Sequence, residues 1–488
     1  MSGLLACSVL VPIAGAFITY PMKSRLRDRM AAVVASLTFV AAMVAAWLSY
    51  PRADRFFIGQ LPWLKATTPF FGLLIDQLSS LMLVVITLIG VLVVVYSSGY
   101  LSSSNRGHSY LEAKGGYYFW LLLFIGSMVG IAVSPSFLQL FIFWEMTTIC
   151  SWALISYHRD DQSLFNGFKA LTITHLGGMA LIAALALLYV NTGSLAFNAL
   201  DELSPNLKLT VFILILIAAW AKAAQVPFHT WLPDAMVAPT PISAYLHAAA
   251  MVKAGVYLVA RTALSNTTLP RSAGIVIGVM AVITIIVAVL MYFLQDDLKR
   301  LLAFSTIGHL GYILFGISLG IMGSATGFRG GILHIVNHGC AKALLFLSVG
   351  AIAYATGSRS IKELSGLSRK MPIVSLAFII GLFAVTGVAP LSCFWSKFMM
   401  FTGAFEIGGI LGPFMGVLLV LESLAAFAWY LLVGHRVFFG KVSEKADGAA
   451  GGLPLVITGS LVVLMLLCLL APVIGWPLVK YLSVGAFH

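Results

Sequence analysis

Fourteen apolar runs, each long enough to cross a bilayer, constrain the fold of this chain more than any other feature. A transmembrane helix needs about 20 predominantly apolar residues. The predicted spans lie near residues 3–21, 30–50, 70–99, 117–133, 135–157, 166–190, 209–237, 241–264, 272–294, 301–322, 328–355, 372–403, 411–439 and 453–484. The pattern therefore predicts an all-α, polytopic membrane protein with about 14 transmembrane helices.

Composition supports one transmembrane domain over residues 1–488 and no soluble domain. The chain is 60% hydrophobic and 9% charged, whereas soluble domains carry about 25% charged residues. The longest polar connections are 51–69, 100–116 and 191–208, which leave no room for a nucleotide-binding domain. No Walker-type sequence is present, so an ion gradient or a partner must drive whatever the protein does.

The net charge of +12 would suggest nucleic acid in a soluble protein. Here the basic residues gather in short loops: 16 follow odd-numbered spans, against 7 after even-numbered spans and at the C-terminal end. The positive-inside rule then predicts cytoplasmic odd loops and both termini outside. We expect the lipid bilayer, and no nucleic acid, as a partner. The first run is predicted to be a retained span, because no signal-peptide cleavage site stands out after it.

The cysteines are scattered singly, at positions 7, 150, 340, 393 and 468. No Cys-x-x-Cys spacing occurs, which argues against zinc and iron–sulfur sites. We expect no metal site and no bound cofactor.

Two spans are interrupted by proline next to a lysine. Lys222 precedes Val226-Pro227 in the seventh span, and Lys397 follows Ala389-Pro390 in the twelfth. The breaks lie five spans apart. Because five is odd, the second copy of a repeated five-helix unit would cross the membrane in the opposite direction to the first. Broken helices at matching positions of inverted repeats indicate a transport site. We predict a first repeat over residues 117–264 and a second over 272–439.

Ionisable side chains inside the spans are the candidate functional residues. A charge at the bilayer centre costs roughly 2.5–3.5 kcal/mol on insertion scales, so such groups are usually functional. Glu145 is the predicted ion partner of Lys222, and a lysine whose acidic partner moves away can release a proton. The alternative for Glu145 is a carboxylate neutralised in a helix contact, and the alternative for Lys397 is a side chain that snorkels to the surface.

The eleventh span places His334, His338 and Lys342 at i, i+4 and i+8, along one helix side of about 12 Å. Histidine titrates near neutrality and can pass a proton either way. His309 and His175 are single, and a core histidine explains each equally well. The predicted polar axis, which needs water between its members, comprises Glu145, Lys222, His247, Lys253, His334, His338, Lys342 and Lys397.

Three segments closely resemble the antiporter-like subunits: Lys222-Ala-Ala-Gln-Val-Pro-Phe-His-Thr-Trp, Ile-Ser-Ala-Tyr-Leu-His247 and Met-Val-Lys253-Ala-Gly-Val-Tyr. That family comprises the large membrane subunits of respiratory complex I, MrpA and MrpD of the Mrp sodium/proton antiporters, and relatives in membrane-bound hydrogenases. The resemblance covers nearly the whole chain. It implies fourteen helices with two inverted five-helix repeats, a prokaryotic inner membrane, and other membrane subunits as partners.

The resemblance also implies residue roles. Glu145 matches the family's fifth-helix glutamate, and Lys222 matches its seventh-helix lysine. His247 and Lys253 match the relay on the eighth helix, and Lys397 matches the terminal lysine. At His175-Leu-Gly-Gly178 many complex I relatives carry an Arg…Asp pair, so the chain is more similar to MrpA or a hydrogenase subunit. It ends after the fourteenth span, without the lateral helix or extra spans of some relatives, which leaves the assembly open.

Two functions remain in competition. The first is an ion-translocating subunit of a multi-subunit complex that moves protons, alone or in exchange for sodium, and the complex itself can be redox-driven. The second is a membrane redox subunit that binds haem or quinone through the intramembrane histidines. A third, weaker alternative is a solitary transporter of another solute.

Overall fold

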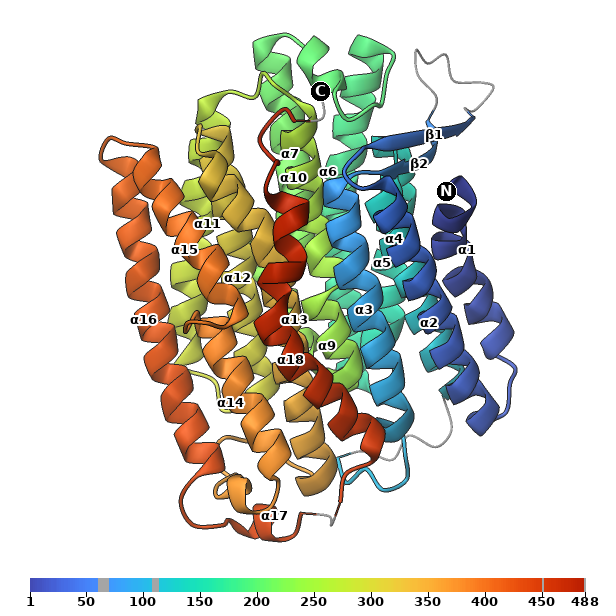
Figure 1. Ribbon diagram of the computed structural model, residues 1–488, viewed down its shortest axis with the longest axis vertical. Helices are drawn as coiled ribbons and strands as arrows, with labels where there is room; N and C mark the ends of the chain where they lie inside the picture. Colours follow the sequence, from blue (N-terminus) through green and yellow to red (C-terminus); the bar gives the residue numbers. More distant parts are fainter. Residues whose placement is uncertain (60–69, 108–113, 450–451, 487–488) are drawn as a thin grey trace.

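The computed structural model describes residues 1–59, 70–107, 114–449 and 452–486, and helices dominate it (Figure 1). This confirms the predicted all-α class. Thirteen helical segments of the described residues are long and apolar enough to cross a membrane. The broken pair α14 (Pro372–Thr386) and α15 (Ser392–Glu406) occupies the one remaining predicted span.

The other spanning helices pack side by side along one common direction (Figure 1). Their bounds are α1 (Ser2–Thr19), α2 (Ser24–Ser49), α3 (Gln77–Tyr100), α4 (Lys114–Val133), α5 (Phe137–Ile155), α6 (Asp161–Thr192), α7 (Pro205–Lys222), α9 (Thr240–Ala248) with α10 (Met251–Ser265), α11 (Arg271–Tyr292), α12 (Leu298–Ile321), α13 (Ala325–Thr356), α16 (Leu411–Phe438) and α18 (Leu455–Val479). The short elements are β1 (Asp54–Gly59), β2 (Phe71–Ile75), η1 (Ala199–Glu202), η2 (Phe228–Thr230), α8 (Trp231–Asp234), η3 (Ala235–Val237), η4 (Leu367–Arg369) and α17 (Glu444–Asp447).

Helix α13 forms the centre of the bundle and packs against α3, α9, α12, α14, α15 and α18. The helices α1 and α2 lie at one edge of the molecule and α16 lies at the opposite edge (Figure 1). The apolar windows of α12 and α13 are entirely buried, whereas only 33% of the window in α16 is buried. Polar groups on the central helices are therefore shielded by protein, and the edge helices present apolar side chains outward.

The third span begins later than predicted, because residues 71–75 form strand β2 rather than helix. This strand pairs antiparallel with β1, and the Gln139 side chain bonds both the N–H and the C=O of Gly72 at 2.9 Å. Asp76 then caps α3 by accepting a hydrogen bond from the Ser79 N–H at 2.8 Å. An apolar strand of five residues cannot be told from helix by hydropathy alone.

Three breaks interrupt the spanning helices. The helix α7 ends at Lys222, and α14 ends at Thr386, six residues before α15 begins. Proline ring geometry accounts for both, as the sequence predicted. The third break separates α9 from α10 at Ala249-Ala250, where the sequence contains neither proline nor glycine. That break was not predicted, and it places Lys253 in the first turn of α10.

Two distant regions share local details. Helices α6 and α13 each contain 32 residues, and each ends in Thr-Gly-Ser with the glycine at positive φ. Isolated bridges join Ser136 to Ala196 and Asp297 to Ser360, which links the start of α5 to the end of α6 and the start of α12 to the end of α13. The segment from α5 to α6 and the segment from α12 to α13 therefore share these local details.

Candidate functional site

Lys222 is fully buried at the broken end of α7. Its Nζ donates hydrogen bonds to the Trp144 carbonyl at 2.7 Å and to the Thr148 hydroxyl at 2.6 Å. The ammonium also lies 4.6 Å from the centroid of the Trp144 ring. Immediately after the helix, Ala224 adopts a positive φ of 49°, a conformation that is costly for a residue with a side chain. The break therefore ends the helix abruptly and leaves the lysine against α5.

Among the described residues Glu145 forms no hydrogen bond or ion pair with Lys222, so the predicted direct contact is absent, although the carboxylate is close enough to act electrostatically on the lysine. Its Oε2 lies 2.8 Å from His175 Nδ1 on α6, and the two side chains are 22% and 53% exposed. This contact with His175 holds the carboxylate against α6. Gly178 makes room for this carboxylate, since a Cβ there would lie 2.2 Å from Glu145 Oε1.

His247 lies at the end of α9 and is fully buried. Its ring packs against Phe346 with centroids 4.6 Å apart. Among the described residues, neither ring nitrogen has a hydrogen-bond partner. Buried polar atoms are rarely left unpaired, so both nitrogens of this imidazole remain available to hydrogen-bond water or another polar group.

Lys253 and the histidines of α13 are brought together by the break between α9 and α10. The Lys253 Nζ lies 3.0 Å from His338 Nδ1 and donates to the Ile335 carbonyl at 2.9 Å. The sequence predicted that both belong to the polar axis but did not predict their contact. Direct proton exchange between ammonium and imidazole requires such a hydrogen-bond distance.

His309 on α12 joins the same cluster, although the sequence did not distinguish it from a core histidine. Its Nδ1 lies 2.9 Å from His334 Nε2, and its ring stacks on that of His338 with centroids 5.0 Å apart. His334 Nδ1 in turn lies 2.8 Å from the Ser396 hydroxyl on α15. The complete burial of the apolar window of α12 is a property of the fold, so no signal in the sequence separated His309 from a core histidine.

Lys342 lies two helical turns beyond His334 on α13, but its contact is separate from the histidines. Its Nζ donates to the Leu302 carbonyl at 3.1 Å. Buried Lys299, which was not among the predicted site residues, donates similarly to the carbonyls of Met236 and Ala238 at 2.8 and 2.6 Å. Both ammonium groups are thus held by neutral backbone oxygens.

Lys397 is 3% exposed, so it does not snorkel to the surface of this chain. Its Nζ donates to the Ser423 hydroxyl at 2.9 Å and lies 4.6 Å from the Tyr312 ring centroid. The Tyr312 hydroxyl is 2.8 Å from that of Ser423 and also donates to the carboxylate of Glu422. The sequence left the role of Glu422 open, and the fold connects it to Lys397 through two hydroxyl groups.

One buried ion pair lies apart from the residues of the predicted polar axis. The Arg261 guanidinium donates to the Asp76 carboxylate, and both side chains are 1% exposed. It joins the start of α3 to α10 near the end of the bundle where both chain termini lie (Figure 1). Its position at a helix end indicates a role in holding the helices together.

Comparisons with known proteins give the family. Residues 134–423 match the family described as NADH:quinone oxidoreductase/Mrp antiporter, TM. Residues 63–111 match the NADH-ubiquinone oxidoreductase (complex I) chain 5 N-terminus. A Na(+)/H(+) antiporter subunit of Alkalihalophilus pseudofirmus is 36% identical over 435 residues, which cover 83% of this chain and 53% of that protein. A Na(+)/H(+) antiporter subunit of Staphylococcus haemolyticus is 37% identical over 424 residues, covering 82% and 52%.

Two solved structures share the fold. The Mrp complex from Dietzia sp. contains a chain that superposes with a TM-score of 0.84 and 30% identity, over 96% of this chain and 50% of that one. A chain of the archaeal membrane-bound sulfane sulfur reductase superposes with a TM-score of 0.84 and 25% identity, over 98% and 96%. The chain spans about half the length of the antiporter subunits it matches. These matches confirm the resemblance noted from the motifs, and the chain belongs to the NADH:quinone oxidoreductase/Mrp antiporter transmembrane family.

Proposed function

We propose that this chain is an ion-translocating membrane subunit of a multi-subunit complex, and that it moves protons along its line of buried ionisable groups. The observation that carries the proposal is the linked series from Lys253 to Ser396, in which successive groups are in hydrogen-bond or ring contact in the middle of the bundle. Groups of this kind inside a membrane typically form proton relays.

The relay has hydrogen-bonded segments and three gaps. Hydrogen-bond contacts join Lys253 to His338, His309 to His334, and His334 to Ser396. The rings of His338 and His309 stack, but among the described residues no hydrogen bond joins these two histidines, Lys222 to Lys253, or Ser396 to Lys397. Proton transfer across these three gaps requires bridging water, which is nearly as effective as direct contact when polar groups face it.

The same arrangement is poorly suited to the redox alternative. Two histidines that ligate one haem iron must face each other across the metal, whereas His309 and His334 hydrogen-bond directly to each other at 2.9 Å. His338 is turned to Lys253. At least one ring nitrogen of each of these three histidines is therefore engaged with a protein group at a distance that suits proton transfer.

The proposed orientation follows from the loops. Both termini lie at one end of the bundle, and the connection containing α17 lies at the opposite end (Figure 1). The basic loops belong to that opposite end, and we place it in the cytoplasm on the positive-inside rule. The proposed ion partners are H⁺ and Na⁺, because relatives of this chain are named Na(+)/H(+) antiporter subunits. The matched Mrp and reductase structures are complexes, which supports other membrane subunits as partners.

The decisive test is Lys222→Ala in the assembled complex. Everted membrane vesicles that carry a proton gradient should show sodium-induced dissipation of the gradient with the unaltered protein and none with the variant. Lys441→Ala, which alters an exposed loop lysine, is the matched control. Native electrophoresis must show equal assembly. Undiminished sodium-dependent proton movement in Lys222→Ala would refute the proposal.

A further inference from the structure

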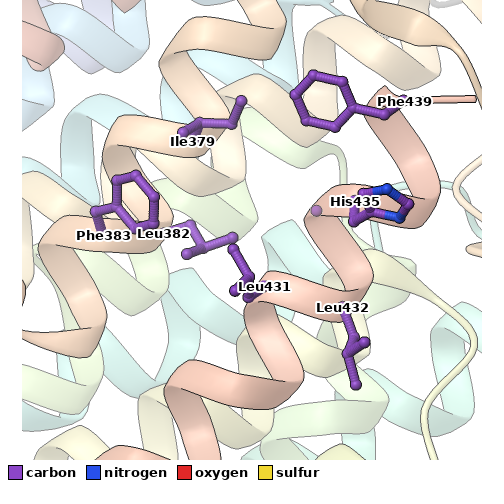
Figure 2. A pocket seen from close by; sticks show the side chains of 8 residues that line it. Ile379, Leu382, Phe383, Leu431, Leu432, His435 and Phe439 are labelled. Atoms are coloured by element: carbon purple, nitrogen blue, oxygen red, sulfur yellow. The ribbon is translucent and has the colours of Figure 1, made fainter.

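An apolar cavity of about 430 Å³ lies between α14 and α16 at the edge of the bundle, away from the line of ionisable groups. Figure 2 shows its lining: Ile379, Leu382 and Phe383 lie on α14, and Leu431 on α16 points toward Leu382. Among the described residues that line it, His435 alone has a polar side chain. The cavity falls within the 300–1,000 Å³ range of small-molecule sites, and its walls suit a hydrocarbon chain.

A second cavity, of about 460 Å³, adjoins the first and shares Leu432 and His435 with it. Its lining includes the cationic side chains of Lys362 and Arg436, together with Gln295 and Asp296. The Asp296 carboxylate already accepts hydrogen bonds from the Ser360 hydroxyl at 2.9 Å and the Lys362 N–H at 3.2 Å. Two cations therefore face one carboxylate that is held by other donors, and the cavity has an excess of positive charge.

Three further details indicate a ligand at this second cavity. Within the described ranges, no ion pair is formed by Lys362 or by Arg436. The Trp429 indole N–H, which also lines the cavity, is buried and has no hydrogen-bond partner among those residues. Leu432, which lines both cavities, is 63% exposed. Tryptophan and basic residues together are typical of the headgroup level of a membrane.

We propose that these joined cavities bind one anionic phospholipid. One acyl chain lies between α14 and α16, and the phosphate lies against Lys362, Arg436 and His435. Charge complementarity selects the anionic headgroup, since basic pockets between transmembrane helices bind such lipids. The apolar wall selects a lipid over a free phosphate, because inorganic phosphate would leave the first cavity unfilled. The proposal does not depend on the direction of transport or on the coupled ion.

The first experiment measures lipid retention. The assembled complex is purified in mild detergent, incubated with vesicles of phosphatidylethanolamine with or without phosphatidylglycerol, washed, and analysed for bound lipid by mass spectrometry. We expect the unaltered complex to retain phosphatidylglycerol and the double variant Lys362→Gln, Arg436→Gln to retain at least about fivefold less, given the contribution of each basic residue at a membrane surface. Lys441→Gln, an exposed loop lysine outside both cavities, should match the unaltered complex. Equal retention by the double variant and this control would overturn the proposal.

The second experiment identifies the occupant directly. A photoreactive p-benzoylphenylalanine at Leu432, the residue common to both cavities, is activated in native membranes. A covalent adduct with the mass of phosphatidylglycerol or another anionic phospholipid supports the proposal. An adduct with a neighbouring protein, or with zwitterionic lipid in proportion to its abundance, overturns it. Gly434→Leu adds a side chain that faces Leu382, since a Cβ there would lie 3.1 Å from Leu382 Cδ1, and it should reduce the lipid adduct without affecting assembly.

Discussion

The two lysines beside the broken helices lie in different surroundings, although the sequence gives each a neighbouring proline break. Lys397 reaches Glu422 through the hydroxyls of Ser423 and Tyr312, and both charged residues are less than a tenth exposed. Lys222 instead donates to Trp144 and Thr148 on α5. Glu145, the acid predicted to pair with Lys222, instead contacts a histidine on the outer face of α6, although it still acts electrostatically on the lysine.

The difference shows that an acid close to a lysine in a helical bundle does not necessarily form a hydrogen bond or ion pair with it. In the second half of the chain, α12, α15 and α16 enclose acid, lysine and linking hydroxyls together. In the first half, Glu145 and His175 lie where a neighbouring protein or lipid would touch α6, since the His175 side chain is 53% exposed. We call the surroundings of Lys222 the first half-site and those of Lys397 the second half-site. We infer that the first half-site is sensitive to what packs against it and that the second is self-contained.

The largest expected effect concerns the self-contained half-site. Lys397→Met removes its cation while keeping much of the side-chain volume, and ion transport should fall about 100-fold, the scale at which positioned proton-transfer groups contribute. Sodium-induced proton movement in everted vesicles measures it, with Lys441→Met as the control. If transport persists while Lys222→Ala abolishes it, only the first half-site lies on the pathway.

A smaller effect is expected from Gly178→Val, which tests the first half-site without changing any charge. Because a Cβ at this position would lie 2.2 Å from Glu145 Oε1, the carboxylate must shift, which disturbs its contact with His175. We expect transport to fall about tenfold, as for loss of a hydrogen bond to a charged group. Gly459→Val is the control, since nothing lies within 4 Å of a Cβ at Gly459. Equal transport by the two variants would mean that the Glu145–His175 pair is not needed.

Tyr312→Phe should have a moderate effect, because it deletes the hydroxyl that connects Glu422 with Ser423. The Leu419 carbonyl oxygen, which lies 2.9 Å from the same hydroxyl, also loses this contact. Buried groups left unpaired cost about 1–3 kcal/mol, so the thermal midpoint should fall and transport should slow several-fold. Tyr245→Phe serves as the control, because the buried Tyr245 hydroxyl has no partner among the described residues. If the two variants behave alike, the link to Lys397 through Tyr312 has no role.

The smallest effect is expected in a connection outside the spans. Burial alone would raise the pKa of Asp201, but hydrogen bonds from Thr268 and Thr267 outweigh it and hold that pKa below its usual value. A carboxylate whose pKa is lower in the folded than in the unfolded state stabilises the fold at pH values above its unfolded-state pKa. That stabilisation is lost as the pH falls through the folded-state pKa. Asp201→Asn should therefore lower stability near neutral pH by at most about 1 kcal/mol after solvent screening. Thermal melts at neutral and strongly acidic pH measure this, and a difference that grows on acidification would contradict it.

The amino-acid sequence by itself determined the number and approximate positions of the spans, because hydropathy is a local property and a bilayer requires a fixed length of apolar chain. It also determined two of the three helix breaks, since proline cannot continue the backbone hydrogen bonds of a helix. The ionisable residues were visible for the same reason: a charge within an apolar run stands out without knowledge of its neighbours.

Only the tertiary structure decided which of these residues touch. The pairing of Glu145 with His175, the place of His309 between two other histidines, and the connection of Lys397 to Glu422 depend on which helix faces meet. Those faces belong to helices far apart in sequence, and their rotations are set by packing across the whole bundle. The break between α9 and α10 has the same origin, because no local residue type demands it.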